Sequence, residues 1–414
     1  MNYEKREYIK RNSELCLIAS ENYPSQDVLN ASGSIFQLKY AEGFPGKRYY
    51  QGTEVVDEME QECIEKCLKL FNASSEYYAN VQPNSGASAN MIVYNAVLKP
   101  GDKVLAMDVK AGGHISHGHE KSFLSKYHLV ETYDVTDDGL LDYEQIRQQA
   151  IKLSPKLIIC GASNYSRIID FNKFKQIADE CGAYLMADIA HISALVAKGE
   201  HPSPVGLADF ITSTTHKSLK GPRGAFILYK QDFDKQIKLS TIPGLFGGPL
   251  EHQIYAKLVC FNEMLTTKAT IYTSQIIKNA KTMEMCFKQN NIPIVSNGTD
   301  NHLMTIDLTN FNITGRELAM LLEECGVIVN CNTVPNDKRS FLETSGIRIG
   351  TPAITARGLE ESDVYSLTQR ISDVINCFTD NCLQIEDCKE SLKNTVRLLV
   401  NLYPLSRIYT YFCE

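Results

Sequence analysis

Short apolar runs alternate with amphipathic stretches between about residue 90 and residue 230. Runs of this kind that are rich in β-forming residues predict strands. The predicted strands cover residues 103–107, 128–133, 156–160, 184–188, 210–214 and 225–228. A helix is predicted over residues 171–181, with Gly182 placed to end it. This alternation predicts an α/β fold with a mostly parallel sheet that is covered on both faces and binds ligands at the carboxyl ends of its strands.

The pattern changes in the last third of the chain, where a long helical region is predicted over residues 253–289. A strand is predicted at residues 302–308, and Thr314-Gly315-Arg316-Glu317 has the spacing of a capping box. The helix that this box opens is expected to end at Gly326. We therefore expect an N-terminal arm over residues 1–30, a large α/β domain over residues 31–270 and a smaller α+β domain over residues 271–414.

Composition narrows the class of protein. Hydrophobic residues make up 43% of the 414 residues and charged residues 22%, which is typical of a folded globular chain. The net charge of -7 argues against binding to a nucleic-acid backbone. No apolar run reaches a membrane-spanning length and the first residues lack the apolar core of a signal peptide, so we expect no membrane association and a cytoplasmic location.

The chain has 13 cysteines, which raises the question of disulfide bonds. Cys63 and Cys67 share an apolar stripe of helical spacing with Val56, Met59 and Leu70. Thiols in such a stripe are expected in the core. Free thiols in a reducing compartment are the favoured interpretation over disulfides.

Lys217 is the first candidate for chemistry. It follows the predicted strand 210–214, within the segment Thr214-Thr215-His216-Lys217. A lysine at the edge of a sheet can be held partly desolvated, which favours the neutral amine that forms a Schiff base. A solvated surface lysine is the alternative for this segment taken alone.

Asp188 ends the apolar run Tyr184-Leu185-Met186-Ala187. A carboxylate there needs a partner, because an isolated buried charge is very unfavourable. A pyridinium nitrogen is such a partner, and the carboxylate would keep it protonated so that the ring acts as an electron sink. The alternative is an aspartate that caps the following helix.

The third candidate is the segment Ser85-Gly86-Ala87-Ser88, which leads into an apolar helix over residues 91–98. A helix N-terminus of small and hydroxyl residues offers free amides and a favourable dipole to a phosphate, although a plain Ser-Gly cap would look the same. The three candidates together supply an amine, a partner for a ring nitrogen and a binding site for a phosphate. They form a coherent site.

Seven stretches of the chain resemble the serine hydroxymethyltransferase family. They cover residues 17–22, 39–43, 45–50, 112–114, 188–191, 214–217 and 344–353, in order and nearly without gaps from about residue 15 to residue 375. The resemblance implies an aspartate-aminotransferase-like fold, which is fold type I of the pyridoxal-phosphate enzymes, with a seven-stranded type of sheet. It also implies reversible transfer of the hydroxymethyl group of serine to tetrahydrofolate, which gives glycine and 5,10-methylenetetrahydrofolate.

The resemblance assigns residues to the cofactor, pyridoxal phosphate. Lys217 would bind it covalently, Asp188 would pair with its ring nitrogen, and His114 would stack on the ring. Ser163 and His191 would lie near the phenolic oxygen. The full set that it implies is Ser85, Gly86, His114, Ser163, Asp188, His191, Thr214, His216, Lys217, Gly247 and Gly248. Gly247 and Gly248 would come from a neighbouring subunit, so an obligate homodimer is expected.

Other positions would serve the substrates serine, glycine and folate. Arg348 would grip the substrate carboxylate with its planar fork. Glu42 would shuttle a proton between the substrate hydroxyl and folate. The amino-acid site would further include Ser20, Tyr40 and Tyr50, and the folate contacts would be Glu42, Tyr49, Val109, Ile115 and Asn332. The catalytic residues implied are Lys217, Glu42, His114, Asp188 and Tyr50.

The chain departs from the family pattern at a few positions. Ala87 stands in place of a second phosphate-binding serine, a loss of about 1 to 2 kcal/mol as a hydrogen bond to a charged group. The other departures are Ala194, Ala225, Ile242 at the folate edge and the loop Pro243-Gly244-Leu245-Phe246-Gly247-Gly248. They leave open a related β-hydroxy-α-amino-acid aldolase or transaldolase that does not use folate.

Two further hypotheses belong to other classes. A catalytically silent binding protein is disfavoured, because it would have no need of Lys217, Asp188 and Arg348 together. A metal site formed by His114, His117, His119 and Glu120 is disfavoured as well, because no distant ligands complete it. No metal is expected.

Overall fold

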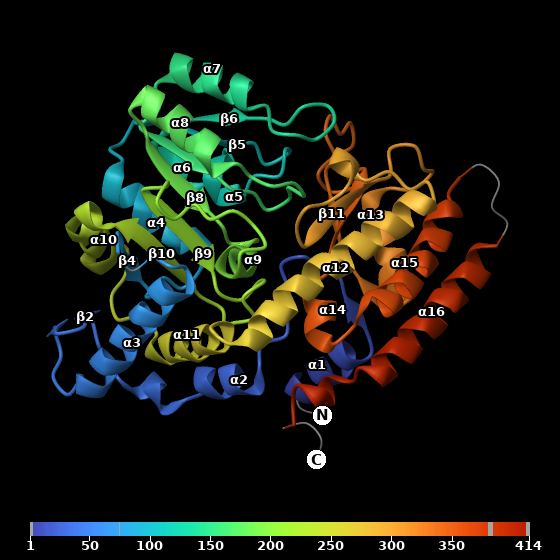
Figure 1. Ribbon diagram of the computed structural model, residues 1–414, viewed down its shortest axis with the longest axis horizontal. Coiled ribbons are helices and arrows are strands. Elements are labelled where there is room, and N and C mark those ends of the chain that lie inside the picture. The colour runs from blue at the N-terminus through green and yellow to red at the C-terminus, as the bar shows by residue number, and fades with distance from the viewer. Residues whose placement is uncertain (1–2, 74, 380–383, 411–414) are drawn as a thin grey trace.

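A seven-stranded sheet forms the centre of the larger of two regions in the computed structural model, which describes residues 3–73, 75–379 and 384–410 (Figure 1). Its strands are β4 (Tyr77–Asn80), β5 (Lys103–Met107), β6 (Leu129–Tyr133), β7 (Leu157–Cys160), β8 (Tyr184–Asp188), β9 (Phe210–Thr214) and β10 (Ala225–Lys230). They lie in the order β4-β10-β9-β8-β7-β5-β6. Five neighbouring strands of the sheet run parallel: β6, β5, β7, β8 and β9. Strand β10 is antiparallel to both of its neighbours, β9 and β4. The predicted α/β fold and mostly parallel sheet are confirmed.

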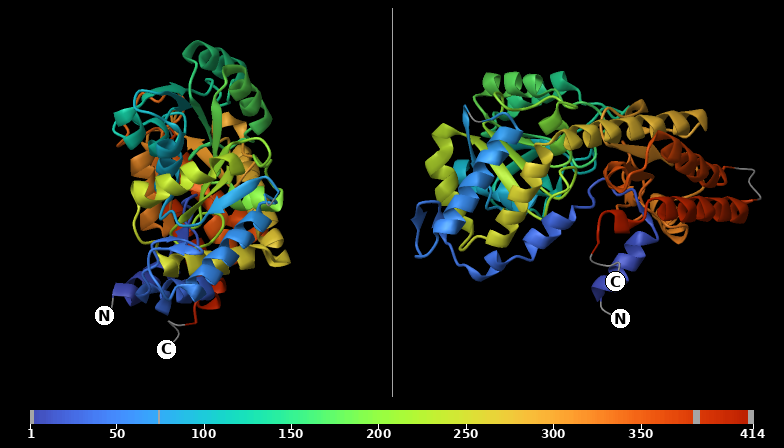
Figure 2. Two further views of the ribbon diagram at one scale, coloured as in Figure 1. Left: turned by 90° about the vertical axis from the view of Figure 1, so that its left-hand side faces the viewer. Right: turned by 60° about the horizontal axis from the view of Figure 1, so that its bottom comes forward.

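Alternate side chains of each strand pack into different cores, because successive residues point to opposite faces. In β7, Ile158 and Cys160 join one buried cluster while Leu157 and Ile159 join another. The first face is covered by α3 (Glu54–Leu70), α7 (Tyr143–Leu153), α8 (Phe171–Cys181), α9 (Ser193–Lys198) and α11 (Glu251–Met264). The second is covered by α4 (Gly86–Val97), α6 (Phe123–Tyr127) and α10 (Asp234–Leu239). The views in Figure 2 show these helices on either side of the sheet.

The C-terminal region has its own core around a three-stranded antiparallel sheet, ordered β11-β14-β13. Its strands are β11 (Leu303–Asp307), β13 (Asn330–Asn332) and β14 (Gly346–Gly350). Its helices are α12 (Thr267–Gln289), α13 (Gly315–Glu324), α14 (Pro352–Arg357), α15 (Glu361–Asn376) and α16 (Ile385–Leu402). The short β12 (Val327–Ile328) pairs with β1 (Leu15–Cys16), which follows α1 (Tyr3–Asn12), so the start of the chain lies against this region. The division into three parts by residue number stays a prediction.

The remaining elements lie around these two cores. They are α2 (Gln26–Ser32), the hairpin of β2 (Gly43–Phe44) and β3 (Lys47–Arg48), α5 (Ile115–Gly118), and the short helical turns Ile35–Leu38, Gln231–Phe233, Ser240–Leu245, Val295–Asn297 and Leu405–Arg407. No helix in the described ranges is both long and apolar enough to cross a membrane.

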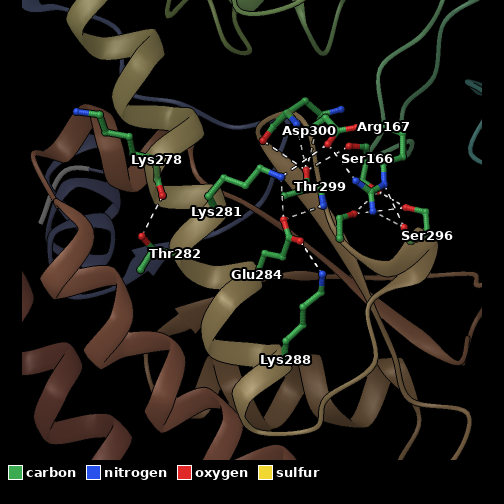
Figure 3. Close-up of polar contacts among 12 residues, drawn as sticks. Ser166, Arg167, Lys278, Lys281, Thr282, Glu284, Lys288, Ser296, Thr299 and Asp300 are labelled. Atoms are coloured by element: carbon green, nitrogen blue, oxygen red, sulfur yellow. Dashed lines mark hydrogen bonds and ion pairs between the residues drawn. The ribbon is translucent and has the colours of Figure 1, made fainter.

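Polar contacts fasten the sheet region to the C-terminal region beside α12 (Figure 3). Arg167 follows β7 and donates to the Ser296 carbonyl over 3.0 Å from Nε, and it lies 3.0 Å from Asp300 Oδ1. On α12, Lys281 lies 3.7 Å from Asp300 and 3.1 Å from Glu284. Because Arg167 lies on the loop that carries Ser163, these contacts help to fix one wall of the site described below.

Several boundaries differ from the predictions. The helix predicted over residues 253–289 is two helices, because Thr266 adopts an extended backbone (φ −82°, ψ 163°) that an α-helix cannot continue through. The helix predicted over residues 91–98 begins earlier, at Gly86, because Ser85 caps it. The capping box at Thr314 is confirmed, but α13 ends at Glu324, since Cys325 and Gly326 donate to carbonyls three residues back. Strand β4 was not predicted.

Candidate active site

A cavity of about 660 Å³ opens where the parallel strands end. Ser163 follows β7, His191 follows β8 and Lys217 follows β9, so the sheet region supplies one wall. The C-terminal region supplies the other wall through Asn332 on β13 and Arg348 on β14. The predicted site residues that line it are Ser20, Ser85, Gly86, Val109, His114, Ile115, Ser163, His191, Thr214, His216, Lys217, Asn332 and Arg348. The cavity thus lies at the carboxyl ends of the strands, as predicted.

Lys217 presents a buried amine to this cavity, since only 8% of the residue is exposed. Burial lowers the pKa of Lys217 to about 8, with the positive charge of Arg348 adding to the shift and Asp188 opposing it. Its backbone is held by Asn22, whose Nδ2 donates to the Lys217 carbonyl over 2.8 Å. A part of this amine is therefore neutral near pH 7, which a surface lysine would not allow.

Asp188 lies at the end of β8 with both carboxylate oxygens bonded. Its Oδ2 accepts hydrogen bonds from Asn90 Nδ2 and His117 Nε2, each over 2.9 Å, and its Oδ1 accepts one from the Ala190 amide over 3.0 Å. Burial raises the pKa of Asp188, but the hydrogen bond and charge of His117 outweigh it and hold the pKa below its ordinary value. The helix-cap interpretation is wrong, because α9 begins at Ser193 with Ile192 as its cap. Asp188 is a permanent buried anion.

The N-terminus of α4 faces the same cavity through Ser85, Gly86 and Ala87. Ser85 caps the helix, and its hydroxyl accepts from the Ser88 amide over 3.2 Å. A side chain at position 86 would bring a Cβ within 2.8 Å of the Thr214 methyl group, so glycine allows the helix to approach β9 closely. Gly86 and Ala87 lie at the wall of the cavity, where the amides at the start of a helix can bind an anion.

Three histidines form much of the remaining wall. Burial lowers the pKa of His114 to about 4, so its ring is neutral, and Gly112 before it has a φ of +113° that favours glycine. His191 is fully enclosed, and burial together with the charge of Lys217 places its pKa well below the ordinary value. His191 stacks on His302, with ring centroids 5.6 Å apart. Burial, with Arg223 nearby, lowers the pKa of His216 to about 4.

Arg348 is the cation on the C-terminal wall, with 9% of the residue exposed. Its Nη1 donates to the Ser163 carbonyl over 2.7 Å and its Nε to Asn330 Oδ1 over 3.2 Å. Burial lowers the pKa of Arg348 to about 10, which still leaves it charged at neutral pH. The contacts orient the guanidinium plane, as recognition of a carboxylate by a fork of N–H groups requires.

These groups fit a phosphate-bearing pyridine cofactor. The cavity combines a buried amine with a lowered pKa, a buried carboxylate behind it, a neutral imidazole at its wall and the N-terminus of a helix.

Five predicted residues gather elsewhere, in a group that we call the hairpin cluster: Tyr40, Glu42, Tyr50, Gly247 and Gly248. The Tyr40 and Tyr50 rings lie 4.9 Å apart. A Cβ on Gly247 would lie 3.6 Å from Glu42 Oε1, and one on Gly248 would lie 3.0 Å from the Tyr40 ring. Within the described chain none of the five lines the cavity of Lys217, and neither does Tyr49, which is 69% exposed. In one chain Glu42, Tyr49 and Tyr50 lie away from the cavity of Lys217, because the β2–β3 hairpin packs against α3 and α11. Their roles in a site shared between subunits stay a prediction.

A second hollow of about 620 Å³ adjoins the cavity. The two share Ser20, Glu21, His216 and Arg223 in their walls. Residues of α1 and α2 complete the second hollow. The site of Lys217 is thus open on the side of the N-terminal elements.

Asn22, Asn90, His117 and His302 were not given a role from sequence. His117 was considered only as a metal ligand, yet it bonds Asp188, a residue 71 positions away. Its position three residues after His114 was a signal, but its partner could not be identified without the fold. In the part of the chain that the structure describes, no group of three or more His, Cys, Asp or Glu side chains could hold a metal ion.

Comparison with known proteins gives a consistent result. The family model described as serine hydroxymethyltransferase matches residues 1–371. A serine hydroxymethyltransferase of Lactobacillus johnsonii is 50% identical over 97% of this chain and 96% of its own length. That of Lactobacillus gasseri is 49% identical over 95% of each chain. A probable serine hydroxymethyltransferase of Mesomycoplasma hyopneumoniae is 47% identical over 97% of this chain and 94% of its own length.

Proposed function

The chain belongs to the serine hydroxymethyltransferase family, and from this premise we propose how its residues divide the work of catalysis. The protein is a pyridoxal-phosphate-dependent enzyme that reversibly transfers the hydroxymethyl group of serine to tetrahydrofolate, giving glycine and 5,10-methylenetetrahydrofolate. The observation that carries the division of roles is the buried amine of Lys217, held in one cavity with Asp188 behind it and the start of α4 beside it.

The cofactor is bound at three points. Lys217 attaches to it, because its lowered pKa leaves neutral amine near pH 7. Asp188 keeps a proton on the ring nitrogen, since its own pKa is held low by His117 and Asn90. Ser85 and Gly86 bind the phosphate at the N-terminus of α4. When bound, pyridoxal phosphate supplies an electron sink for breaking the bond between the α-carbon and the hydroxymethyl carbon.

The amino acid is oriented by the opposite wall. Arg348 binds its carboxylate, and the contact with the Ser163 carbonyl keeps the guanidinium in place. The neutral His114 ring would stack on the cofactor, and because it is uncharged it adds no further cation to Lys217 and Arg348. His191 and Ser163 would contact the phenolic oxygen of the cofactor. Thr214 and His216 line the same cavity beside Lys217.

The hairpin cluster completes the site of a second copy of the chain. Glu42 moves a proton between the serine hydroxyl and folate, Tyr40 and Tyr50 enclose the amino acid, and Gly247 and Gly248 reach the partner's phosphate. This proposal is supported by the absence of these residues from the cavity wall in the described chain and by the hollow that leaves the cavity open beside Ser20 and Glu21. The active unit is therefore a homodimer with shared sites. We further propose that it works in the cytoplasm.

Folate enters from the mouth of the cavity. Val109, Ile115 and Asn332 line it, and Ile115 exposes 61% of its surface there. Tyr49 joins them from the partner subunit along with Glu42. The side chains of Val109 and Ile115 offer apolar contact to a flat aromatic ligand, and Asn332 offers hydrogen bonds.

Absorbance of the purified protein with pyridoxal phosphate tests these roles. Addition of glycine alone is expected to change the visible band slightly, and addition of tetrahydrofolate with glycine is expected to produce a strong red-shifted band. A response to amino acids that ignores folate would contradict the folate contacts, and a protein that never gains visible absorbance would contradict the role of Lys217.

Mixed dimers test the shared site. E42Q and K217Q homodimers are both expected to be nearly inactive. A hybrid of the two has one site that combines an intact Lys217 with an intact Glu42, so hybrids are expected to regain about half of the native activity. A hybrid as inactive as its parents would contradict the sharing of residues between subunits.

A further inference from the structure

A buried carboxylate on α3 joins two parts of the chain that serve different functions. Glu60 is 1% exposed and lines neither the cavity nor the adjoining hollow. Its Oε2 accepts from Arg48 Nη2 over 2.6 Å, and its Oε1 accepts from Gln82 Nε2 over 2.8 Å. Each oxygen thus binds a different segment of the chain. Because Glu60 is buried, the loss of either hydrogen bond would cost free energy of folding.

On one side, Arg48 fixes the backbone around Glu42. Arg48 Nη1 donates to the carbonyl of Ala41 over 2.8 Å and to that of Gly43 over 3.0 Å. These are the residues immediately before and after Glu42. Arg48 Nε donates to Asp57 Oδ1 over 2.7 Å, which orients the guanidinium from α3 as well. The side chain of Arg48 is 1% exposed, so its position depends on these buried partners.

On the other side, Gln82 lies in the turn from β4 to α4 that leads to Ser85. Its Nε2 also donates to the Gly43 carbonyl over 2.9 Å. The same turn is held from α11, where Lys257 Nζ donates to the carbonyls of Val81 over 2.6 Å and Pro83 over 3.0 Å. The turn at the phosphate end of the site and the segment that carries Glu42 are therefore tied to one buried carboxylate.

We propose that Glu60 is a positioning residue for two active sites at once. Through Arg48 it sets the Glu42 segment that completes the site of the partner subunit, and through Gln82 it sets the turn that presents Ser85 and Gly86 in the site of its own subunit. The inference rests on the shared-site dimer proposed above. It extends that proposal by assigning one buried residue a different effect on each site.

The mixed dimer separates the two effects. In a hybrid of E42Q and K217Q subunits, the K217Q subunit donates Glu42 and the E42Q subunit supplies Lys217. The additional substitution E60Q replaces one carboxylate oxygen by an amide nitrogen, which cannot accept a hydrogen bond. The glutamine therefore cannot replace both carboxylate oxygens, one of which accepts from Arg48 and the other from Gln82. It is placed either in the subunit that donates Glu42 or in the one that supplies Lys217.

In the Glu42 donor, E60Q is expected to lower kcat by roughly threefold to tenfold, the effect of weakening one buried contact, with the dissociation constant of pyridoxal phosphate unchanged. In the Lys217 supplier, it is expected to raise that dissociation constant by roughly threefold or more, with kcat at saturating cofactor unchanged. Visible absorbance titration gives the constant for the single competent site. Q82M removes the link from Glu60 to the turn and also the contact with the Gly43 carbonyl, so it is expected to raise the cofactor constant in the Lys217 supplier and to lower kcat in the Glu42 donor.

E62Q is the matched control, because Glu62 lies on the same helix with half of its side chain exposed. It is expected to change neither quantity in either subunit. The role of Glu60 would be overturned if E60Q changed kcat and the cofactor dissociation constant equally in both placements, or changed neither. A substitution that only made its subunit less stable would affect the hybrid in the same way in either subunit. Thermal unfolding of the cofactor-free hybrids measures that stability directly. An inactive parent hybrid would instead contradict the shared site itself.

Discussion

The charge state of Lys217 is set by the residues that enclose it. Its amine is buried beside Arg348, and both conditions disfavour a proton on it, while Asp188 favours one. The result is a pKa of about 8, below that of an exposed lysine. A neutral amine is the form that attacks an aldehyde, so the surroundings of Lys217 prepare it for cofactor capture.

The pH dependence of cofactor capture follows from this pKa. The neutral fraction of Lys217 grows as pH rises, so the rate at which cofactor-free enzyme gains visible absorbance is expected to rise with a midpoint near pH 8 and to level off at higher pH. Stopped-flow mixing with pyridoxal phosphate from pH 6 to pH 10 measures it. In R348M the midpoint is expected to move to higher pH, because a nearby positive charge is lost. A rate that keeps climbing to pH 10 in the native enzyme would contradict the lowered pKa.

His117 acts on the cofactor ring through Asp188. H117Q is expected to raise the pKa of Asp188 and to lower kcat roughly tenfold, since the substitution weakens a hydrogen bond to a buried charge worth about 1.5–3 kcal/mol. The visible spectrum of the bound cofactor is expected to shift as well, which a loss of stability alone would not cause. H119Q is the control, because His119 contacts the Lys121 amide instead. Native kcat in H117Q would show that Asn90 and the Ala190 amide hold the carboxylate without His117.

At the scale of one element, the first turn of α4 decides how the phosphate is bound. Ser85 caps the helix and leaves Gly86 and Ala87 at the cavity wall. Ala87 has no hydroxyl to add to the backbone amides. The helix therefore offers a phosphate site with one side-chain donor fewer than the family pattern implies.

Restoring that donor tests the site. A87S is expected to tighten pyridoxal phosphate binding by about 1 to 2 kcal/mol, or roughly fivefold to thirtyfold, as a hydrogen bond to a charged group does. S85A is expected to weaken binding and also to destabilise the helix by about 1 kcal/mol through loss of its cap. Titration by absorbance gives the first quantity and thermal unfolding the second. An unchanged affinity in A87S would place the phosphate elsewhere.

At the scale of the whole molecule, the cavity lies between the sheet region and the C-terminal region, each of which has its own core. Lys217 and Ser85 come from the sheet region, and Asn332 and Arg348 come from the C-terminal region. Arg167 and Asp300 fasten the same two regions outside the cavity. A ligand that contacts both walls adds to these contacts and stabilises the packing of the two regions against each other.

Cofactor binding is therefore expected to stabilise the folded protein as a unit. At a free cofactor concentration about 100 times the dissociation constant, the free energy of unfolding is expected to rise by about 2.7 kcal/mol. Denaturant unfolding at a fixed protein concentration, with and without pyridoxal phosphate, measures the change. K217Q is expected to lose most of it at the same cofactor concentration. Equal stabilisation of K217Q would contradict attachment at this lysine.

Much of the fold was predictable from local pattern. Strands β5, β8 and β9 occupy the residues predicted for them, and α8 runs from Phe171 to Cys181 with Gly182 left-handed at its end. Buried parallel strands are uniformly apolar, so their signal is local. Strand β4 lacked that signal, and the break at Thr266 was missed because helical periodicity continues on both sides of it.

The residue types at the site were also determined by the sequence. Lys217, Asp188, Ser85 and Arg348 lie in short motifs that specify their chemistry. Lys217 follows β9, Asp188 ends β8, Ser85 caps α4 and Arg348 lies within β14. Only the tertiary structure decided which of them meet. It brought His117 and Asn90 to Asp188, and it kept Glu42 and Tyr50 away from Lys217 by packing their hairpin on α3 and α11. Spacing along a chain records local geometry, whereas contacts between distant segments depend on how whole elements pack.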